Sequence, residues 1–262
     1  MRLYFLHFYR NNPDSNFDAC FLLCYNSTNF TNYFRRILKM DGIIFDVDGT
    51  LWDSTEVVAR SWNQAINENS DLPADLTAAK IKSLFGKTMN EITAALFPSF
   101  SEEDRSRLGD LCFAYENRLL ATEPGTLYPG VREAFQALSE KFDLYIVSNC
   151  QCGYIEVFLE GTNLGPFVKD TLCFGQTGRP KNESIRILME KNHLKDVCYI
   201  GDTMGDYDAC QKAGVPFIFA EYGFGEVPEA EVRIQNIREL EQLLLNKLFF
   251  YLFIFFIHGL FL

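Results

Sequence analysis

Short apolar runs recur along the middle of the chain, and polar residues follow each of them. The first run, residues 42–47, ends in acidic residues and glycine. Similar runs occupy residues 144–147, 197–200 and 216–220. A short, nearly continuous apolar run is typical of a strand that is buried on both faces of a parallel sheet. The pattern therefore predicts parallel strands whose carboxyl ends carry polar groups.

Helical periodicity fills the intervals between the later runs. Apolar residues recur there at spacings of three and four, as they do on the buried face of a helix. A proline precedes one of these segments and a glycine closes another, and both are typical of helix ends. Alternating strands and helices predict an α/β fold, with a parallel sheet and helices on both of its faces. The helical positions are Val131, Phe135 and Leu138; Ile185, Leu188 and Met189 after Pro180; and 209–213, closed by Gly214.

Residues 55–121 break this alternation, because they show helical patterns only. Ser101, with Asp104 three residues later, predicts a helix start whose acidic first turn lies at the positive end of the helix dipole. An all-helical insert after the first strand would form a second, small domain. We expect it to lie over the carboxyl ends of the strands, where open α/β sheets bind their ligands. Its apolar stripes are Val58, Trp62, Ala65 and Ile66; Ile92, Ala95 and Leu96; and Leu108, Leu111, Cys112, Tyr115 and Leu119.

Both ends of the chain differ from its middle. Residues 1–39 are rich in Phe, Tyr and Asn without the order of a signal peptide, so a start site misplaced upstream of Met40 and a genuine extension both stay open. Residues 248–262 are almost purely apolar but shorter than the roughly 20 residues of a membrane-spanning helix. A frameshifted or mis-spliced end, a short membrane anchor and a buried terminal helix are the alternatives there. We therefore divide the chain into an extension (1–39), a core (40–54 and 122–247), a helical cap (55–121) and an apolar tail (248–262).

Composition narrows the choice of partners and compartment. Lys and Arg number 24 against 35 Asp and Glu, a net charge of −11, which leaves no basic surplus for a nucleic acid partner. Eight cysteines in 262 residues are too sparse for a secreted disulfide scaffold, and they show no zinc-finger spacing. We expect free thiols in a reducing cytoplasm, with a redox-sensitive site at Cys150 and Cys152 as the alternative.

Polar residues at the carboxyl ends of the predicted strands, or at the start of the next helix, form four short motifs. Each motif alone is common in unrelated proteins, but their joint occurrence, in this order, indicates one functional site. The motifs are Asp46-Val47-Asp48-Gly49-Thr50, Ser148-Asn149, Lys181, and Gly201-Asp202-Thr203-Met204-Gly205-Asp206.

In this order the motifs resemble those of the haloacid dehalogenase superfamily of phosphohydrolases, and residues 55–121 resemble the small helical cap of that family. The resemblance covers residues 40–247 and is closest to the phosphoglycolate-phosphatase-like branch. It implies a Rossmann-like core and an inserted cap domain. It also implies hydrolysis of a small phosphorylated metabolite, a phosphate monoester, through an aspartyl-phosphate intermediate with bound Mg²⁺.

Cleavage of a phosphate ester through an enzyme-bound intermediate needs a nucleophile, a proton donor and compensation for concentrated negative charge, and the residue types suit these distinct roles. Asp46 would attack phosphorus, while Asp48 would protonate the leaving oxygen and later activate water. Lys181 would neutralise the phosphoryl oxygens and hold Asp46 ionised. Several carboxylates in one place suit Mg²⁺, and the expected ligands are Asp46, Asp202 and Asp206, with the backbone carbonyl of Asp48 added by the resemblance. The expected substrate-binding residues are Gly49, Thr50, Ser148, Asn149 and, in the cap, Lys87.

Three alternatives stay open for these residues. The same motifs resemble those of sugar phosphomutases of the β-phosphoglucomutase type, in which the phospho-aspartate donates to a sugar; release of inorganic phosphate separates the two. A catalytically silent binding module is disfavoured because the acidic and basic site residues are all retained. Lys87 is expected either to present a cation to the distal group of the substrate or to be a solvated lysine after Gly86.

Overall fold

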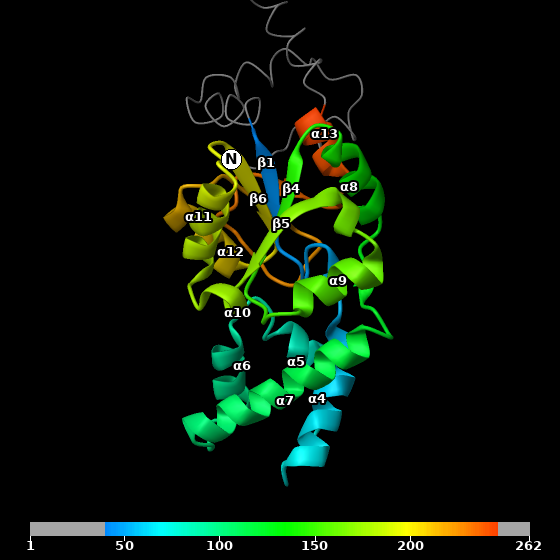
Figure 1. The fold of residues 1–262 in the computed structure, drawn as a ribbon, viewed down its shortest axis with the longest axis vertical. Coiled ribbons are helices and arrows are strands. Elements are labelled where there is room, and N and C mark those ends of the chain that lie inside the picture. The colour runs from blue at the N-terminus through cyan, green and yellow to red at the C-terminus, as the bar shows by residue number, and fades with distance from the viewer. Residues whose placement is uncertain (1–39, 246–262) are drawn as a thin grey trace, which may run out of the picture.

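A six-stranded parallel sheet, in the order β5-β4-β1-β6-β7-β8, forms the centre of the molecule. The computed structural model describes residues 40–245 (Figure 1). Strand β1 lies between β4 and β6, with Ile43 opposite Leu144 on one side and Cys198 on the other. The strands are β1 (Gly42–Phe45), β4 (Asp143–Ser148), β5 (Val168–Cys173), β6 (Val197–Gly201), β7 (Phe217–Ala220) and β8 (Arg233–Ile234).

Helices cover both faces of this sheet, which confirms the predicted α/β architecture (Figure 1). Because successive residues of a strand point to opposite faces, Ile44 packs with the helices α11 and α12, whereas Ile43 and Phe45 pack with α8 and α9. The helices of the core are α8 (Val131–Ser139), α9 (Tyr154–Thr162), a 3₁₀ turn (Gly165–Phe167), α10 (Phe174–Thr177), α11 (Lys181–Lys191), α12 (Met204–Ala213) and α13 (Glu239–Leu245).

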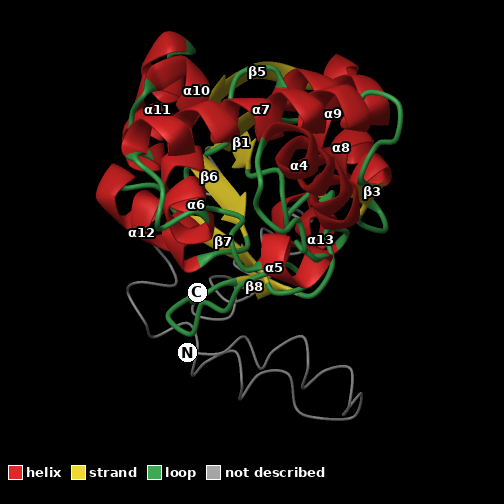
Figure 2. Ribbon diagram, turned by 90° about the horizontal axis from the view of Figure 1, so that it is seen from below, coloured by secondary structure: helices red, strands yellow, loops and turns green. Residues whose placement is uncertain are grey.

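Four helices lie beyond the carboxyl ends of the strands, and Figure 2, seen from that side, shows α4, α6 and α7 in front of β1 and β6. The chain enters and leaves this layer through a small antiparallel pair, in which Trp52 lies opposite Leu127. The layer therefore sits where an open α/β sheet binds its ligands. Its elements are α4 (Thr55–Asn69), α5 (Ala78–Lys82), α6 (Met89–Leu96) and α7 (Glu102–Leu120), and the pair is β2 (Trp52–Asp53) and β3 (Thr126–Leu127).

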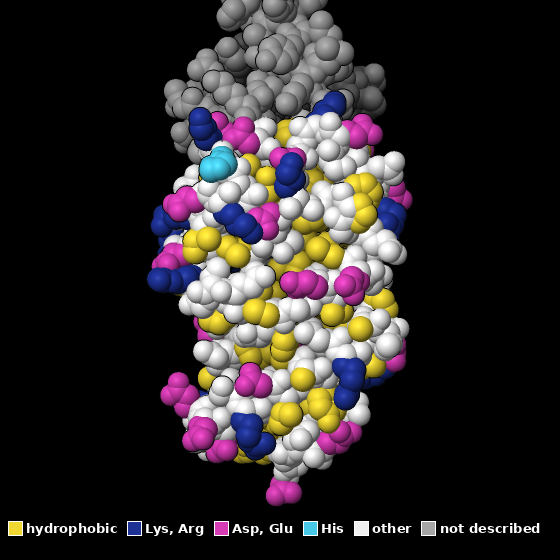
Figure 3. All heavy atoms as spheres, in the orientation of Figure 1, with side chains coloured by type: hydrophobic (Ala, Val, Ile, Leu, Met, Phe, Trp, Pro, Cys, Tyr) yellow, Lys and Arg dark blue, Asp and Glu magenta, His cyan; other side chains and the backbone are white. Residues whose placement is uncertain are grey.

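The surface and the cysteines of the described residues bear on the expected partners. On the face drawn in Figure 3, Lys and Arg side chains lie singly among acidic ones and gather into no basic patch. Across residues 40–245, no helix has both the length and the apolar character needed to cross a membrane. The six cysteines of this range are free thiols. The predictions for 1–39 and 248–262 lie outside the described residues.

Candidate active site

The loop after β1 carries Asp46 and Asp48. The Asp46 N–H still donates to the Ile200 carbonyl at 2.9 Å, so this residue continues the strand and its side chain is buried. A tight turn follows, in which the Gly49 N–H donates to the Trp52 carbonyl at 3.0 Å. The turn brings both carboxyl groups to the carboxyl edge of the sheet.

Lys181 links Asp46 to Asp206. It is the first residue of α11, and its Nζ lies 3.1 Å from Asp46 Oδ1 and 2.5 Å from Asp206 Oδ1. Burial opposes the charge of Lys181, but Asp206 and Asp46 together raise its pKa above its usual value. Burial also raises the pKa of Asp46 to about 7, against the pull of Lys181. The lysine is therefore cationic and is placed to compensate negative charge at Asp46.

Asp48 is held through one oxygen only. Its Oδ1 accepts hydrogen bonds from Trp52 Nε1 at 3.0 Å, Ser54 Oγ at 2.9 Å and the Tyr154 hydroxyl at 2.6 Å. Burial raises the pKa of Asp48 to about 6, against these three donors. Within residues 40–245 its Oδ2 has no hydrogen-bond partner. This oxygen is free to exchange a proton with a bound molecule in the cavity that Asp48 lines.

Gly49 and Thr50 contact Asp202, which follows β6 and is fully buried. Asp202 accepts hydrogen bonds from Thr50 Oγ1 at 3.3 Å and from the Phe224 N–H at 2.7 Å. Gly49 has a φ of +81°, and a Cβ added there would lie 2.1 Å from Asp202 Oδ2. Only glycine fits this approach, so the observed contacts of Gly49 and Thr50 serve to position Asp202.

Asp206 completes an acidic cluster with Asp46 and Asp202, in which one ligand atom from each residue lies within 4.8 Å of the others. Its Oδ2 caps α12 by accepting from the N–H and hydroxyl of Thr203, at 3.0 and 2.6 Å. Burial raises the pKa of Asp202 well above its usual value, and the neighbouring Asp206 and Asp46 add to this effect. Three buried carboxyl groups beside one lysine form an oxygen-rich donor set that fits a hard divalent cation.

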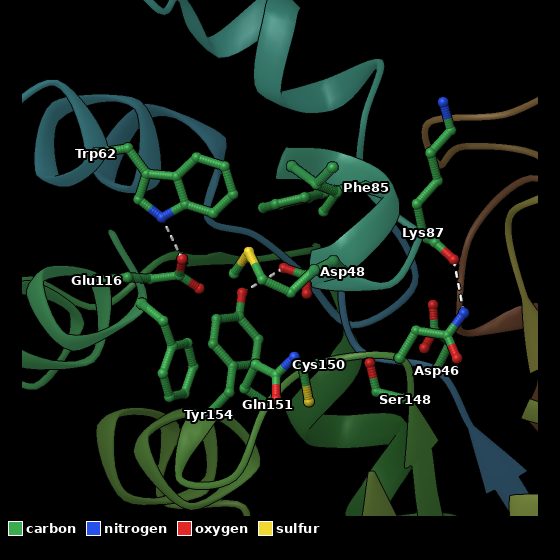
Figure 4. Close-up of a pocket in the computed structure, with 15 residues that line it drawn as sticks. Asp46, Asp48, Trp62, Phe85, Lys87, Glu116, Ser148, Cys150, Gln151 and Tyr154 are labelled. Atoms are coloured by element: carbon green, nitrogen blue, oxygen red, sulfur yellow. Dashed lines mark hydrogen bonds between the residues drawn. The ribbon is translucent and has the colours of Figure 1, made fainter. Parts of the chain in front are cut away.

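Ser148 ends β4 and Asn149 follows it, and both line the same cavity. Ser148 is buried, and Asn149 donates from Nδ2 to the Gly86 carbonyl at 2.7 Å, which joins the core to the helical layer. Lys87 is exposed, and Figure 4 shows its side chain directed away from Asp46 and Asp48. The structure thus brings Ser148 and Asn149 to the carboxylates and leaves Lys87 at the rim.

Sequence reasoning missed the residues that close the cavity on the side of Asp48. Tyr154 belongs to an apolar face of α9, so its hydroxyl contact with Asp48 had no signal in the sequence pattern. Glu116 is buried in α7 and accepts a hydrogen bond of 2.5 Å from Trp62 Nε1. The sequence did carry a signal that Glu116 is buried, because Glu116 continues the four-residue spacing of Leu108 and Cys112 along the same face of the helix. The cavity of about 50 Å³ is lined by Asp46, Asp48, Trp62, Phe85, Gly86, Lys87, Met89, Ile92, Phe113, Glu116, Ser148, Asn149, Cys150, Gln151 and Tyr154.

Comparison with known proteins finds sequence relatives over most of the chain. The family model described as haloacid dehalogenase-like hydrolase matches residues 43–220. A phosphoglycolate phosphatase of Rhodobacter capsulatus is 28% identical over 200 residues, which cover 71% of this chain and 86% of that protein. The pyrophosphatase PpaX of Listeria innocua is 26% identical over 181 residues, which cover 67% and 80% of the two chains.

Solved structures share the fold. A crystal structure described as a predicted phosphatase from Clostridium acetobutylicum has a TM-score of 0.67 at 22% identity and covers 79% of this chain and 99% of its own. One described as a predicted phosphoglycolate phosphatase from Haemophilus somnus has a TM-score of 0.68 at 20% identity, with coverage of 78% and 97%. At these identities the likeness establishes the fold of the chain and not its substrate.

Proposed function

The chain belongs to the haloacid dehalogenase-like hydrolase family, and from this premise we propose that it hydrolyses a small phosphate monoester through a phosphorylated Asp46, with Mg²⁺ bound at the acidic cluster. Its phosphatase relatives support phosphate hydrolysis as the reaction class. One observation carries the proposal: two carboxyl groups line the same cavity, one paired with a buried lysine and the other held so that one oxygen stays free.

The two carboxyl groups divide the reaction between them. Asp46 attacks phosphorus, the ester P–O bond breaks, and Asp48 gives its proton to the departing oxygen. Asp48, now ionised, takes a proton from a water molecule whose oxygen attacks the phosphorus of the aspartyl phosphate. The bond to Asp46 then breaks and inorganic phosphate leaves. Lys181 stays beside Asp46 throughout and compensates charge on the phosphoryl oxygens.

The acidic cluster fits Mg²⁺ through its oxygen donors and its shortage of positive charge. We assign direct ligation to Asp46 and Asp202, joined by the backbone carbonyl of Asp48 as the family resemblance implies. Asp206, whose two oxygens accept hydrogen bonds from Lys181 and Thr203, adds negative charge to the cluster and holds Lys181. When bound, the metal ion offsets the negative charge of the phosphoryl group.

The remaining polar residues of the edge would surround the phosphoryl group. Ser148 and Asn149 would donate hydrogen bonds to its oxygens, Asn149 after releasing the Gly86 carbonyl. Gly49 and Thr50 would support the phosphoryl group indirectly, because they shape the loop that carries Asp46. Lys87 would contribute positive charge at the entrance of the cavity. We also propose that residues 55–121 form a cap domain over a core of 40–54 and 122–247. The free cysteines of the described chain suit an enzyme of the reducing cytoplasm.

Phosphate release from a panel of small phosphate esters tests this proposal. We expect turnover with Mg²⁺, its loss on chelation by EDTA, and its recovery when Mg²⁺ is restored. Asp46→Asn should abolish turnover with every ester. Undiminished hydrolysis in rigorously metal-free protein, or by Asp46→Asn, would contradict the proposal. Transfer to a sugar phosphate without release of inorganic phosphate would instead identify the mutase reaction.

A further inference from the structure

The wall of the cavity that belongs to the helices α4 to α7 is mainly apolar. It is formed by Trp62, Phe85, Met89, Ile92 and Phe113, together with two ionisable residues, Lys87 and Glu116. Lys87 is exposed at the rim, whereas Glu116 is only 4% exposed. Among the described residues that line this wall, the ionisable group inside the cavity is therefore an acid.

Glu116 has one paired and one unpaired oxygen. Its Oε2 accepts from Trp62 Nε1, and the Trp62 ring is itself buried, which fixes the carboxyl group in place. The other oxygen has no hydrogen-bond partner among residues 40–245. Among the side-chain nitrogen and oxygen atoms of this range, the one that is both fully buried and without a hydrogen-bond partner is Asn117 Oδ1. The unpaired oxygen of Glu116 is therefore not fully buried. Oε1 of Glu116 thus opens on the cavity.

The position of Glu116 relates it to the leaving group. Figure 4 shows Trp62, Glu116 and Tyr154 at one end of the cavity and Ser148 and Asp46 at the other, with Asp48 between them. The phosphoryl group must reach Asp46, and the leaving oxygen must reach Asp48. The rest of the leaving group therefore extends from Asp48 toward Glu116 and its aromatic neighbours.

A buried carboxyl group with a free oxygen is costly unless a ligand supplies a hydrogen-bond donor. Burial raises the pKa of Glu116 to about 8, and Asp48 adds to that effect, so its free oxygen is a pure acceptor once the proton is lost, as it is above that pH or beside a bound ammonium group. A carboxylate on the leaving group of the substrate would share the cavity with the carboxyl groups of Asp46, Asp48 and Glu116. The cationic end of Lys87 is directed away from Asp46 and Asp48 (Figure 4). A hydroxyl or ammonium group would instead satisfy Oε1.

Resting on the proposed phosphatase function, we infer that Glu116 selects the substrate: the enzyme prefers phosphate esters whose leaving group ends in a hydrogen-bond donor, and it discriminates against those that end in a carboxylate. The chain would then differ in substrate from those relatives that are named phosphoglycolate phosphatases, since phosphoglycolate ends in a carboxylate.

Four esters that differ mainly in their end group test this inference on the full chain with Mg²⁺. They are ethyl, 2-hydroxyethyl and 2-aminoethyl phosphate, and phosphoglycolate. We expect kcat/KM for the hydroxyl or the ammonium ester to exceed that of ethyl phosphate by about 10-fold or more, and phosphoglycolate to fall below ethyl phosphate. Comparison of the hydroxyl and ammonium esters identifies which donor is preferred. A preference for phosphoglycolate would overturn the inference.

Glu116→Gln provides the second arm, because the amide oxygen can still accept from Trp62 while the acceptor oxygen offered to the ligand is replaced by an NH₂ donor. We expect the ratio of kcat/KM between the best donor ester and phosphoglycolate to fall by about 10-fold or more. Glu103→Gln, which changes an exposed glutamate on the same helix, should leave this ratio unchanged.

The outcomes separate the two proposals. If the esters are hydrolysed but Glu116→Gln leaves the ratio unchanged, the substrate inference is wrong and the phosphatase function stands. If none of a broad set of esters releases phosphate, the proposed function itself fails and takes the inference with it. Because the order of the four esters is measured on the unaltered protein, the test does not depend on the folding of a variant.

Discussion

Asp46 and Asp48 stand two residues apart but have different surroundings. Asp46 faces Lys181 at 3.1 Å, and Asp48 accepts three hydrogen bonds on a single oxygen. Of those three donors, the Tyr154 hydroxyl is the nearest, at 2.6 Å. Burial and the proximity of Asp48 raise the pKa of this hydroxyl well above its usual value, so it stays protonated and donates. Tyr154 is thus a positioning residue for Asp48.

Replacing Tyr154 tests that role. Tyr154→Phe should lower kcat by roughly 10-fold on alkyl phosphates, because Asp48 loses one of the donors that orient it. The effect should be much smaller with aryl phosphates, whose leaving group needs little protonation. Tyr207→Phe, on α12, serves as the control. An equal loss on both classes of ester would show that Tyr154 is merely structural.

Gly49 gives a second prediction at the scale of the residue. Gly49→Ala would force a methyl group into Asp202 at a positive φ, so Asp202 must move. We expect at least a 100-fold loss of Mg²⁺-dependent turnover and a loss of roughly 1–3 kcal/mol in the free energy of unfolding. Gly178 also has a positive φ, of +59°, but open space surrounds it. Gly178→Ala should therefore lower the free energy of unfolding and leave turnover unchanged. Normal turnover by Gly49→Ala would show that Asp202 is not a ligand of the metal ion.

At the scale of the element, helix α7 shows that the sequence predicts where a helix starts more accurately than which of its residues are buried. Ser101 accepts a hydrogen bond from the Asp104 N–H at 3.1 Å, as the motif predicts. Ser101→Ala should lower the free energy of unfolding by about 1 kcal/mol and leave kcat/KM for every ester unchanged. Urea unfolding and phosphate release measure the two effects. A change in ester preference would mean that the start of α7 is coupled to the cavity.

The elements that the sequence did not predict have physical reasons. The strands β1, β4, β6 and β7 are continuous apolar runs and were predicted, whereas β5 lies at the sheet edge and carries Lys169 and Asp170. Edge strands need no continuous apolar run. Strand β8 has two residues, too few for a periodic signal. In α7 the predicted stripe was partly wrong, because the buried line runs through Leu108, Cys112, Glu116 and Leu120.

At the scale of the whole molecule, the site is assembled where the ends of the three strands β1, β4 and β6, together with the start of α11, meet the helical layer. The acidic motifs and Lys181 could be predicted together because parallel strands place their carboxyl ends at one edge. The contacts of Glu116, Tyr154 and Asn149 could not, because each depends on how one element packs against another. Asn149 reaches the Gly86 carbonyl across 63 residues of sequence, a contact that no local pattern encodes.

The central claim is that Asp46 becomes phosphorylated while Asp48 moves protons. Asp48→Asn retains the nucleophile but cannot protonate an alkoxide or deprotonate water. Incubated with Mg²⁺ and an aryl or acyl phosphate, it should accept a phosphoryl group and release it slowly. The mass of the peptide that contains Asp46 should then rise by one phosphoryl group, whereas Asp46→Asn should acquire none. A phosphoryl group on another residue, or identical behaviour of the two variants with every donor, would contradict the account.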